Sequence, residues 1–140
     1  MIRKIEVTDY LRLVEIWESA VSATHDFLKE EDFRYYKQQL PTYFQYVNLY
    51  GWEKDGRLVG FMGIAEGNLE MLFVDNDYRG IGVGKELITY AIDNLEVTKV
   101  DVNEQNVQAL GFYKHIGFQV YERSELDGEG KEYPILHMRL

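Results

Sequence analysis

Residues 71–92 read MLFVDNDYRGIGVGKELITYAI, and this stretch decides the fold class. Its first four residues are all apolar, as in a buried strand. After Gly84 the apolar residues recur every three or four positions, which predicts one buried face of a helix. That face consists of Leu87, Ile88, Ala91, Ile92 and Leu95. A strand therefore leads through the glycine-rich turn 79–84 into a helix.

The residues before this stretch predict one strand and two helices. Residues 2–6 form the strand, and Thr8 caps the first helix. The second helix follows Leu28, and Pro41 ends or kinks it. The inward positions, spaced as one helical face demands, are Tyr10, Leu13, Val14, Trp17 and Val21 in the first helix and Phe33, Tyr36 and Leu40 in the second.

A meander of three antiparallel strands comes next, at 46–54, 57–66 and 69–74. The pairs Asp55 with Gly56 and Gly67 with Asn68 favour tight turns between these strands. The third strand runs into the glycine-rich turn.

Beyond the helix that follows this turn, residues 99–102 form a fifth strand. A helix joins it to strand 69–74, so the two strands are predicted to be parallel neighbours. Asn106 caps a further helix, and Gly117 ends it. The inward residues of that helix are Ala109, Leu110 and Tyr113.

Two last strands, 118–124 and 133–139, are separated by the acidic loop 125–132. The length of 140 residues and the hydrophobic content of 46% are typical of one domain with its own core. We therefore expect a single α/β domain over residues 1–140. Its mixed sheet has about seven strands, with an antiparallel N-terminal meander and one parallel pair, and about four helices flank it.

The charge balance excludes several partners. Fifteen Lys and Arg residues against 24 Asp and Glu residues give a net charge of −9. A broad basic face for nucleic acid or for an anionic membrane is therefore not expected. Negative charge favours a cationic partner or substrate, and it also serves simple solubility. No stretch has the length and apolar character of a signal peptide or a membrane span, so we expect a cytoplasmic protein.

The sequence has no cysteine, which excludes disulfides, thiolate metal sites and a cysteine nucleophile. His115 and His137 have no ligand spacing with His25 or with each other, so no metal site is predicted. No serine stands in the context of a hydrolase nucleophile.

The glycine-rich turn matches neither of two well-known phosphate loops. A P-loop ending at Gly84 and Lys85 requires glycine where Arg79 stands and Ser or Thr where Glu86 stands. A dinucleotide fingerprint that begins at Gly80 or Gly82 lacks its last glycine. What the stretch does offer is a helix N-terminus, whose free N–H groups attract anions. On its own, such a turn also serves as a plain tight connection from strand to helix.

The pattern Arg79-x-x-Gly82-x-Gly84 resembles the acyl-CoA pyrophosphate loop of the GNAT superfamily of N-acetyltransferases. Residues 106–118, NVQALGFYKHIGF, are similar to a second signature of that superfamily, Asn-x-x-Ala-x-x-Phe-Tyr-x-x-x-Gly-Phe. The element order also follows the family along nearly the whole chain. Residues 23–28 (ATHDFL) and 102–106 (VNEQN) further resemble a bacterial YjaB-like subgroup.

The resemblance implies acetyl-CoA as acyl donor, with no metal. It implies a phosphate loop made of Arg79, Gly80, Ile81, Gly82, Val83, Gly84 and Lys85. The pantetheine arm then pairs with the backbone of Leu72, Phe73 and Val74, because the neighbouring strand diverges and leaves that edge open. Asn106 resembles the residue that contacts the pantetheine or pyrophosphate, although a plain helix cap also explains it.

The resemblance also implies catalytic roles. Tyr113 resembles the family's general acid, which protonates the departing thiolate; packing alone is the alternative. A backbone N–H near Phe73 or Val74 would polarise the carbonyl. Because Glu70 stands two residues before Leu72, we expect it on the same strand face, as the base or amine-binding group or as an ordinary solvated carboxylate. His25 lies in the predicted acceptor wall, as a substrate contact or as a structural hydrogen bonder.

The acceptor is a primary amine, on a small molecule or on a peptide or protein. Tyr35, Tyr36, Tyr43, Tyr46 and Tyr50 suggest either an aromatic cage for such a cation or interleaved core and surface positions. The sequence thus predicts an acetyl-CoA-dependent N-acetyltransferase that works by direct attack in a ternary complex, as a monomer or homodimer. A non-catalytic acyl-CoA-binding or regulatory module is the alternative.

Overall fold

A computed structural model describes residues 1–140 and contains one seven-stranded sheet. The strand order is β1-β2-β3-β4-β5-β7-β6, and every neighbouring pair is antiparallel except β4 and β5. The strands are β1 (Ile2–Lys4), β2 (Asn48–Lys54), β3 (Arg57–Ala65), β4 (Asn68–Val74), β5 (Lys99–Asn103), β6 (Gln119–Ser124) and β7 (Ile135–Arg139). The predicted mixed sheet with one parallel pair is confirmed.

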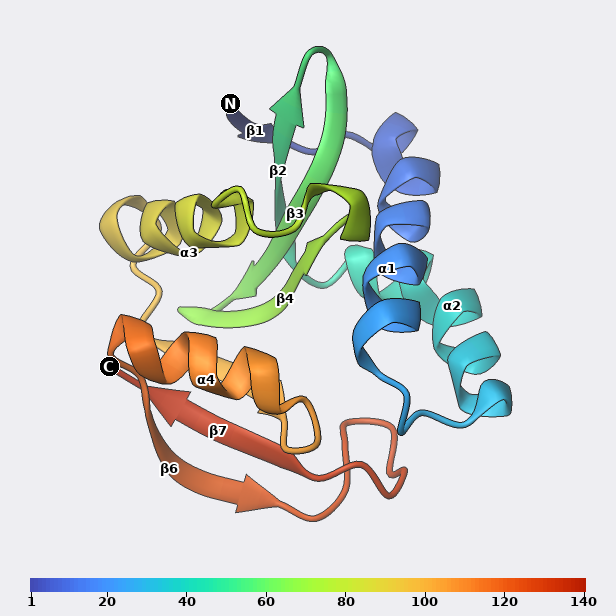
Figure 1. The fold of residues 1–140 in the computed structure, drawn as a ribbon, viewed down its shortest axis with the longest axis vertical. Helices are drawn as coiled ribbons and strands as arrows, with labels where there is room; N and C mark the ends of the chain where they lie inside the picture. The colour runs from blue at the N-terminus through green and yellow to red at the C-terminus, as the bar shows by residue number, and fades with distance from the viewer.

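Four α-helices pack on the two faces of this sheet (Figure 1). They are α1 (Tyr10–Thr24), α2 (Glu30–Phe44), α3 (Val83–Asn94) and α4 (Val107–Ile116). Two short 3-10 turns, η1 (Val7–Asp9) and η2 (Asn76–Tyr78), precede α1 and α3. None of the helices is long and apolar enough to cross a membrane.

Alternation along β3 separates two apolar clusters. Met62 and Ile64 belong to the cluster that includes α3 and α4, whereas Phe61 belongs to the cluster under α1 and α2. Both clusters are centred on the meander, where Leu13, Phe61 and Met62 are fully buried. The meander is therefore the rigid base from which the loops of the site project.

The parallel pair β4 and β5 is short. Only two residue pairs are in register, Asn68 with Lys99 and Leu69 with Val100. Beyond Leu69 the two strands no longer pair, so residues 70–74 have no strand neighbour on the β5 side. The expected open edge of β4 is therefore present.

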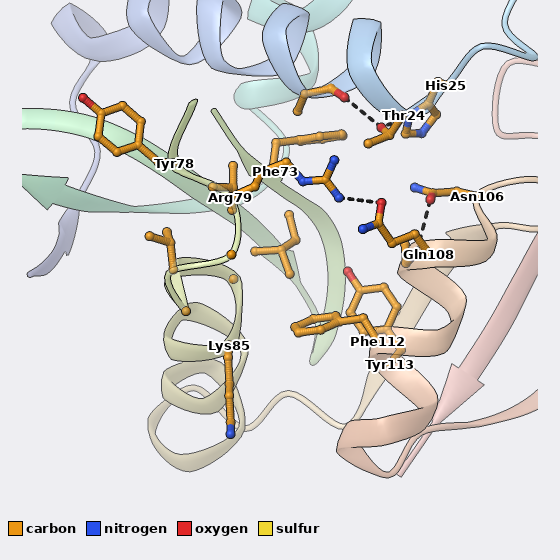
Figure 2. A pocket seen from close by; sticks show the side chains of 18 residues that line it. Thr24, His25, Phe73, Tyr78, Arg79, Lys85, Asn106, Gln108, Phe112 and Tyr113 are labelled. Carbon is orange, nitrogen blue, oxygen red and sulfur yellow. Dashed lines mark hydrogen bonds between the residues drawn. The ribbon is translucent and has the colours of Figure 1, made fainter. Parts of the chain in front are cut away.

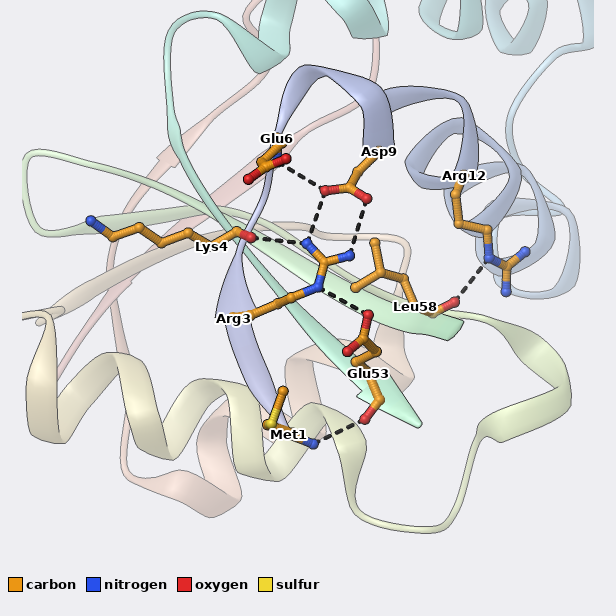
Figure 3. Close-up of polar contacts among 8 residues, drawn as sticks. All are labelled: Met1, Arg3, Lys4, Glu6, Asp9, Arg12, Glu53 and Leu58. Carbon is orange, nitrogen blue, oxygen red and sulfur yellow. Dashed lines mark hydrogen bonds and ion pairs between the residues drawn. The ribbon is translucent and has the colours of Figure 1, made fainter. Parts of the chain in front are cut away.

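One local expectation about a helix is wrong. Thr8 lies inside η1 and does not cap α1; instead the Glu6 amide donates to Asp9 Oδ2 over 2.9 Å (Figure 3). Pro41, which was expected to end or kink the second helix, does not end it, because α2 continues to Phe44. Leu40 and Phe44 are both buried, and this packing outweighs the missing N–H of Pro41.

The turns of the meander rely on left-handed backbone. Asp55 and Gly56 have φ of 53° and 78°, as a two-residue hairpin turn requires. The second turn lies at Glu66 and Gly67, with φ of 52° and 76°, one residue earlier than predicted.

Ion pairs hold the N-terminal elements on the sheet (Figure 3). Arg3 binds both oxygens of Asp9, at 2.9 and 3.0 Å, and donates from Nε to Glu53 at 3.0 Å. Arg12 donates from Nε to the Leu58 carbonyl at 2.9 Å and from Nη2 to Asp75 at 2.8 Å. These contacts join β1, η1 and α1 to the meander.

Asp75 anchors the start of the loop that leads to α3. Its amide donates to the Val59 carbonyl at 2.8 Å, and its carboxylate accepts from Arg12, Ser19 and the Asp77 amide. Burial alone would raise the pKa of Asp75, but these hydrogen bonds outweigh it and leave the pKa lowered. The loop that follows therefore begins from a fixed, charged anchor.

Candidate active site

A cavity of about 380 Å³ lies between the open edge of β4, the loop before α3, and α4 (Figure 2). Its only charged side chains are Arg79 and Lys85, and no Asp or Glu lines it. Of the residues predicted to bind the cofactor, Ile81 alone is absent from its wall. The Ile81 side chain is 56% exposed. The first cavity is thus a cationic pocket inside an acidic protein.

The glycine loop is shaped by backbone conformation. Gly80 and Gly82 have φ of 80° and 93°, a region that other residues rarely adopt. A Cβ on either would meet no atom within 4 Å, so conformation and not space requires glycine there. Because α3 begins at Val83, the N–H groups of its first turn have no partner inside the helix. They offer donors for an anion at this wall.

The two cations of the loop point in different directions. Arg79 donates from Nη2 to Gln108 Oε1 over 2.5 Å and thereby reaches the first turn of α4 (Figure 2). Lys85 instead extends along α3, away from Arg79 (Figure 2). Arg79 is therefore the cation that reaches across this cavity.

A second cavity of about 330 Å³ lies between α1, α2, β4, β5 and the segment that precedes β7. It shares a wall with the first, made of His25, Leu72, Phe73, Asn106, Ala109 and Tyr113. Its charged side chains are Glu70, Asp101 and Asp127, with no Lys or Arg. Two adjoining cavities of opposite charge thus meet at one group of residues.

Tyr113 belongs to this shared wall and is only 6% exposed. Its ring packs against those of Phe112 and Phe118, with centroids 5.3 and 6.0 Å away. Burial raises the pKa of the Tyr113 phenol well above its usual range. At neutral pH the residue therefore holds its proton and can donate it.

His25 also belongs to the shared wall, and its hydrogen bonds define its tautomer. Thr24 Oγ1 lies 2.7 Å from the Ala20 carbonyl and 2.7 Å from His25 Nδ1. The single hydroxyl proton goes to the carbonyl, so His25 Nδ1 carries a proton and donates to Thr24. Burial lowers the pKa of His25 to about 4, against a small opposing effect of Asp26. His25 is therefore neutral at pH 7, with an unprotonated Nε2.

Asn106 caps α4 as predicted. Its Oδ1 accepts from the Ala109 amide at 3.2 Å, and its side chain lies on the shared wall (Figure 2). Because the cap occupies only the oxygen, the amide nitrogen is available for a second partner.

Glu70 lies in the wall of the second cavity, and so does Leu72. The pairing of β3 with β4 shifts between Ile64 with Leu69 and Gly63 with Met71, so Glu70 is the extra residue of a bulge. Strict alternation along β4 is therefore interrupted at Glu70. Burial and the charge of Asp101 raise the pKa of Glu70, although Asn68 opposes them.

The five tyrosines do not form a common cage. Tyr36 and Tyr43 line the second cavity, but their hydroxyls bond Asp127 and Glu129 of the loop before β7. Tyr46 is 77% exposed, and Tyr50 packs against a ring outside both cavities.

Several residues that line the two cavities were not predicted as site residues from the sequence. Gln108 and Phe112 stand at helix positions next to the recognised motif. Asp101 is a polar residue between the buried Val100 and Val102, and such alternation marks it as facing away from the core. Asp127 comes from a loop that the sequence describes only as acidic. No group of three or more His, Cys, Asp or Glu side chains is arranged to hold a metal ion.

Comparison with known proteins agrees with this geometry. A family model described as acetyltransferase (GNAT) domain matches residues 17–140. The chain is 42% identical over 133 residues to peptidyl-lysine N-acetyltransferase YjaB of Escherichia coli K12, covering 90% of this chain and 86% of that protein. It is 28% identical to peptidyl-lysine N-acetyltransferase YiaC of the same organism, covering 87% and 85%.

Solved structures show the same fold. The solution structure of apo-form YjaB from Escherichia coli superposes with a TM-score of 0.91 at 38% identity, covering 99% of this chain and 95% of that one. The PaiA N-acetyltransferase of Thermoplasma acidophilum, solved in complex with coenzyme A, has a TM-score of 0.71 at 22% identity, covering 100% and 98%. The family match, the YjaB relatives and the two joined cavities lead to one conclusion: the chain belongs to the GNAT family of acetyltransferases.

Proposed function

We propose that this protein transfers the acetyl group of acetyl-CoA to a primary amine, by direct attack in a ternary complex. The observation that carries the proposal is the meeting of a cationic and an anionic cavity at Tyr113. Each cavity suits one reactant by charge, and both reactants reach the same wall. Acetyl-CoA supplies the activated acetyl thioester, and the protein supplies binding, orientation and proton transfer.

The donor site is the first cavity. The first-turn amides of α3 and the guanidinium of Arg79 bind phosphate oxygens, and Gly80 and Gly82 let the loop backbone turn toward them. The open edge of β4 at residues 72–74 offers the pantetheine arm a backbone partner. The Asn106 amide nitrogen extends this polar path to the shared wall.

Tyr113 acts as the general acid. Its phenol stays protonated at neutral pH and lies where the two cavities join, so its proton is at hand for the departing thiolate. A tyrosine that only packed in the core would not need its hydroxyl at a cavity wall.

The acceptor amine must lose a proton, and residues of the second cavity accept it. Glu70 acts as the base, because a carboxylate whose pKa is raised holds a proton better than an ordinary one. The unprotonated Nε2 of His25 contacts the amine from the shared wall and accepts a hydrogen bond from it.

The acceptor is a cationic amine, and we place a peptide or protein lysine first. The second cavity is lined by carboxylates and aromatic rings and has no Lys or Arg side chain, which suits an ammonium on an aliphatic stem. YjaB and YiaC, to which the chain is similar, are both named peptidyl-lysine N-acetyltransferases.

One assay separates this enzyme from a non-catalytic acyl-CoA-binding module. Purified protein and acetyl-CoA are incubated with a panel of lysine peptides and small amines, and free CoA is measured with a thiol reagent. We expect CoA release that depends on the added amine, with one acetylated amine per CoA by mass spectrometry. Thermal stabilisation by CoA without amine-dependent release would instead identify a binding module.

A further inference from the structure

The second cavity contains a fixed carboxylate that the proposed mechanism leaves without a task. We propose that Asp101 anchors the ammonium group of the acceptor, and that His137 and Asn68 are positioning residues that hold Asp101 in place. This inference rests on the proposed amine acetylation and assigns the residue that selects a charged acceptor.

Asp101 is held from both neighbouring strands. Its Oδ1 lies 2.6 Å from Nδ1 of His137, which stands opposite it in the register of β5 with β7. Its Oδ2 accepts a hydrogen bond of 3.2 Å from Asn68 Nδ2 on β4. A carboxylate bonded at both oxygens to two strands keeps one orientation, and Asp101 is also part of the cavity wall.

His137 is itself held by a further strand. Its Nε2 lies 2.7 Å from Ser124 Oγ on β6. The ionised carboxylate only accepts hydrogen bonds, so Nδ1 of His137 carries a proton and donates to Asp101. In the neutral imidazole Nε2 then accepts from the Ser124 hydroxyl. Hydrogen bonds thus run from Ser124 on β6 through His137 on β7 to Asp101 on β5 in the cavity wall, and the bond from Asn68 adds β4 as a fourth adjacent strand.

The other carboxylates of the cavity are suited to different tasks. Asp127 Oδ1 accepts from the amides of Glu129 and Lys131, and its Oδ2 accepts from the Tyr36 hydroxyl, so its bonding capacity serves its own loop. Glu70 has a raised pKa, partly because Asp101 is charged nearby. Asp101, bonded at both oxygens, is therefore suited to hold the cation, while Glu70 is free to take its proton.

No lysine or arginine pairs with Asp101. The one basic side chain that bonds it is His137, through Nδ1. Lys99 and Arg139, the basic residues at neighbouring positions of β5 and β7, lie over the ring of Tyr121, at 5.9 and 4.9 Å from its centroid. The charge of Asp101 is therefore left for a ligand, and the side chain is 32% exposed.

The test uses two acceptors whose primary amines end side chains of comparable length but differ in charge. One peptide carries lysine, and a matched peptide carries 4-aminophenylalanine, whose aromatic amine is uncharged at neutral pH. For Asp101→Asn we expect KM for the lysine peptide to rise about tenfold or more, with KM for acetyl-CoA unchanged. KM for the aromatic amine should change less than twofold in Asp101→Asn. Asp101→Glu, which keeps the charge, should bring KM for the lysine peptide most of the way back to the wild-type value.

The positioning role is tested at His137. His137→Asn retains an N–H donor near the position of Nδ1, whereas His137→Leu does not. We expect KM for the lysine peptide to rise severalfold in His137→Leu and to stay near wild type in His137→Asn. Asp93→Asn removes a carboxylate from an exposed position of α3 outside the second cavity and controls for net charge. Retained thermal stabilisation by CoA shows that each variant is folded.

The outcomes separate the two proposals. If Asp101→Asn raises KM for both acceptors by the same factor, or lowers kcat with KM unchanged, Asp101 is not the ammonium anchor. If His137→Asn and His137→Leu behave alike, His137 does not act through its hydrogen bond. If the wild-type protein acetylates neither peptide, the proposed amine acetylation fails at that earlier step.

Discussion

Arg79 donates a 2.5 Å hydrogen bond to Gln108 and so joins the loop before α3 to the first turn of α4. The same guanidinium is the cation that reaches across the donor cavity. A phosphate bound there competes with the Gln108 oxygen for its N–H groups. The strength of this contact therefore bears directly on cofactor affinity.

Arg79→Met should weaken CoA binding about tenfold, since a charge-assisted hydrogen bond to phosphate is lost. Gln108→Ala should leave CoA affinity equal or tighter, because it frees the guanidinium. Isothermal titration calorimetry with CoA at two salt concentrations measures the affinity of each variant. Weaker binding in Gln108→Ala would show that the glutamine, and not the freed arginine, holds the cofactor.

Gly82 and Gly84 form a matched pair for the loop. Gly82 has φ of 93°, so Gly82→Ala should cost about 1–2 kcal/mol of unfolding free energy and weaken CoA binding. Gly84 lies in α3 without a positive φ, and an added Cβ would meet Val74 and Phe112 at 3.8 and 3.9 Å. Gly84→Ala should therefore leave the free energy of unfolding, measured with urea, nearly unchanged. An equal loss of unfolding free energy in both variants would contradict the conformational explanation.

Tyr113→Phe should lower kcat about 100-fold or more, as expected when a general acid is removed. Its CoA affinity should stay within twofold, because the ring still fills the same wall. Tyr90→Phe is the control, since Tyr90 packs against Tyr50 away from both cavities. Normal turnover of Tyr113→Phe on a true substrate would disprove the assignment.

The depressed pKa of His25 makes stability depend on pH in a defined window. Between the usual pKa near 6.5 and the folded value of about 4, the unfolded chain binds a proton that the folded protein excludes. Stability therefore falls as the pH drops through this window, by at most about 1.4 kcal/mol per pH unit.

Urea unfolding of wild type and His25→Gln from pH 7.5 to 4.5 tests this effect. The difference in unfolding free energy between the two should shrink by more than 1 kcal/mol on acidification. A difference that stays constant with pH would mean that His25 is protonated as easily in the folded protein as in the unfolded chain.

The features that the sequence predicted correctly depend on local chemistry. Asn106 caps α4 through a bond to an amide three residues away, and Gly117 ends that helix with φ of 126°. Gly80 and Gly82 adopt the left-handed conformations that their residue type favours. These are contacts within one turn of chain, so the motif alone contains their cause.

Some departures from the sequence predictions have a nonlocal cause. Pro41 was expected to end or kink the second helix, and it stays inside α2 because Leu40 and Phe44 are buried beside it. The bulge at Glu70 arises in the pairing of β4 with β3, which no alternation within β4 reveals. In each case a partner element outweighs the local preference.

The segment 71–92 and the motif 106–118 by themselves predicted the family, the strand-to-helix turn and the residues proposed to bind the donor, because a cap, a glycine conformation and a helix N-terminus act over a few residues. Only the tertiary structure brought together the residues of the proposed acceptor side. Asp101 meets His137 across 36 residues of chain, and Tyr36 meets Asp127 across 91. Contacts of that separation follow from strand order and from loop docking on α2. Local patterns in the sequence encode neither of these.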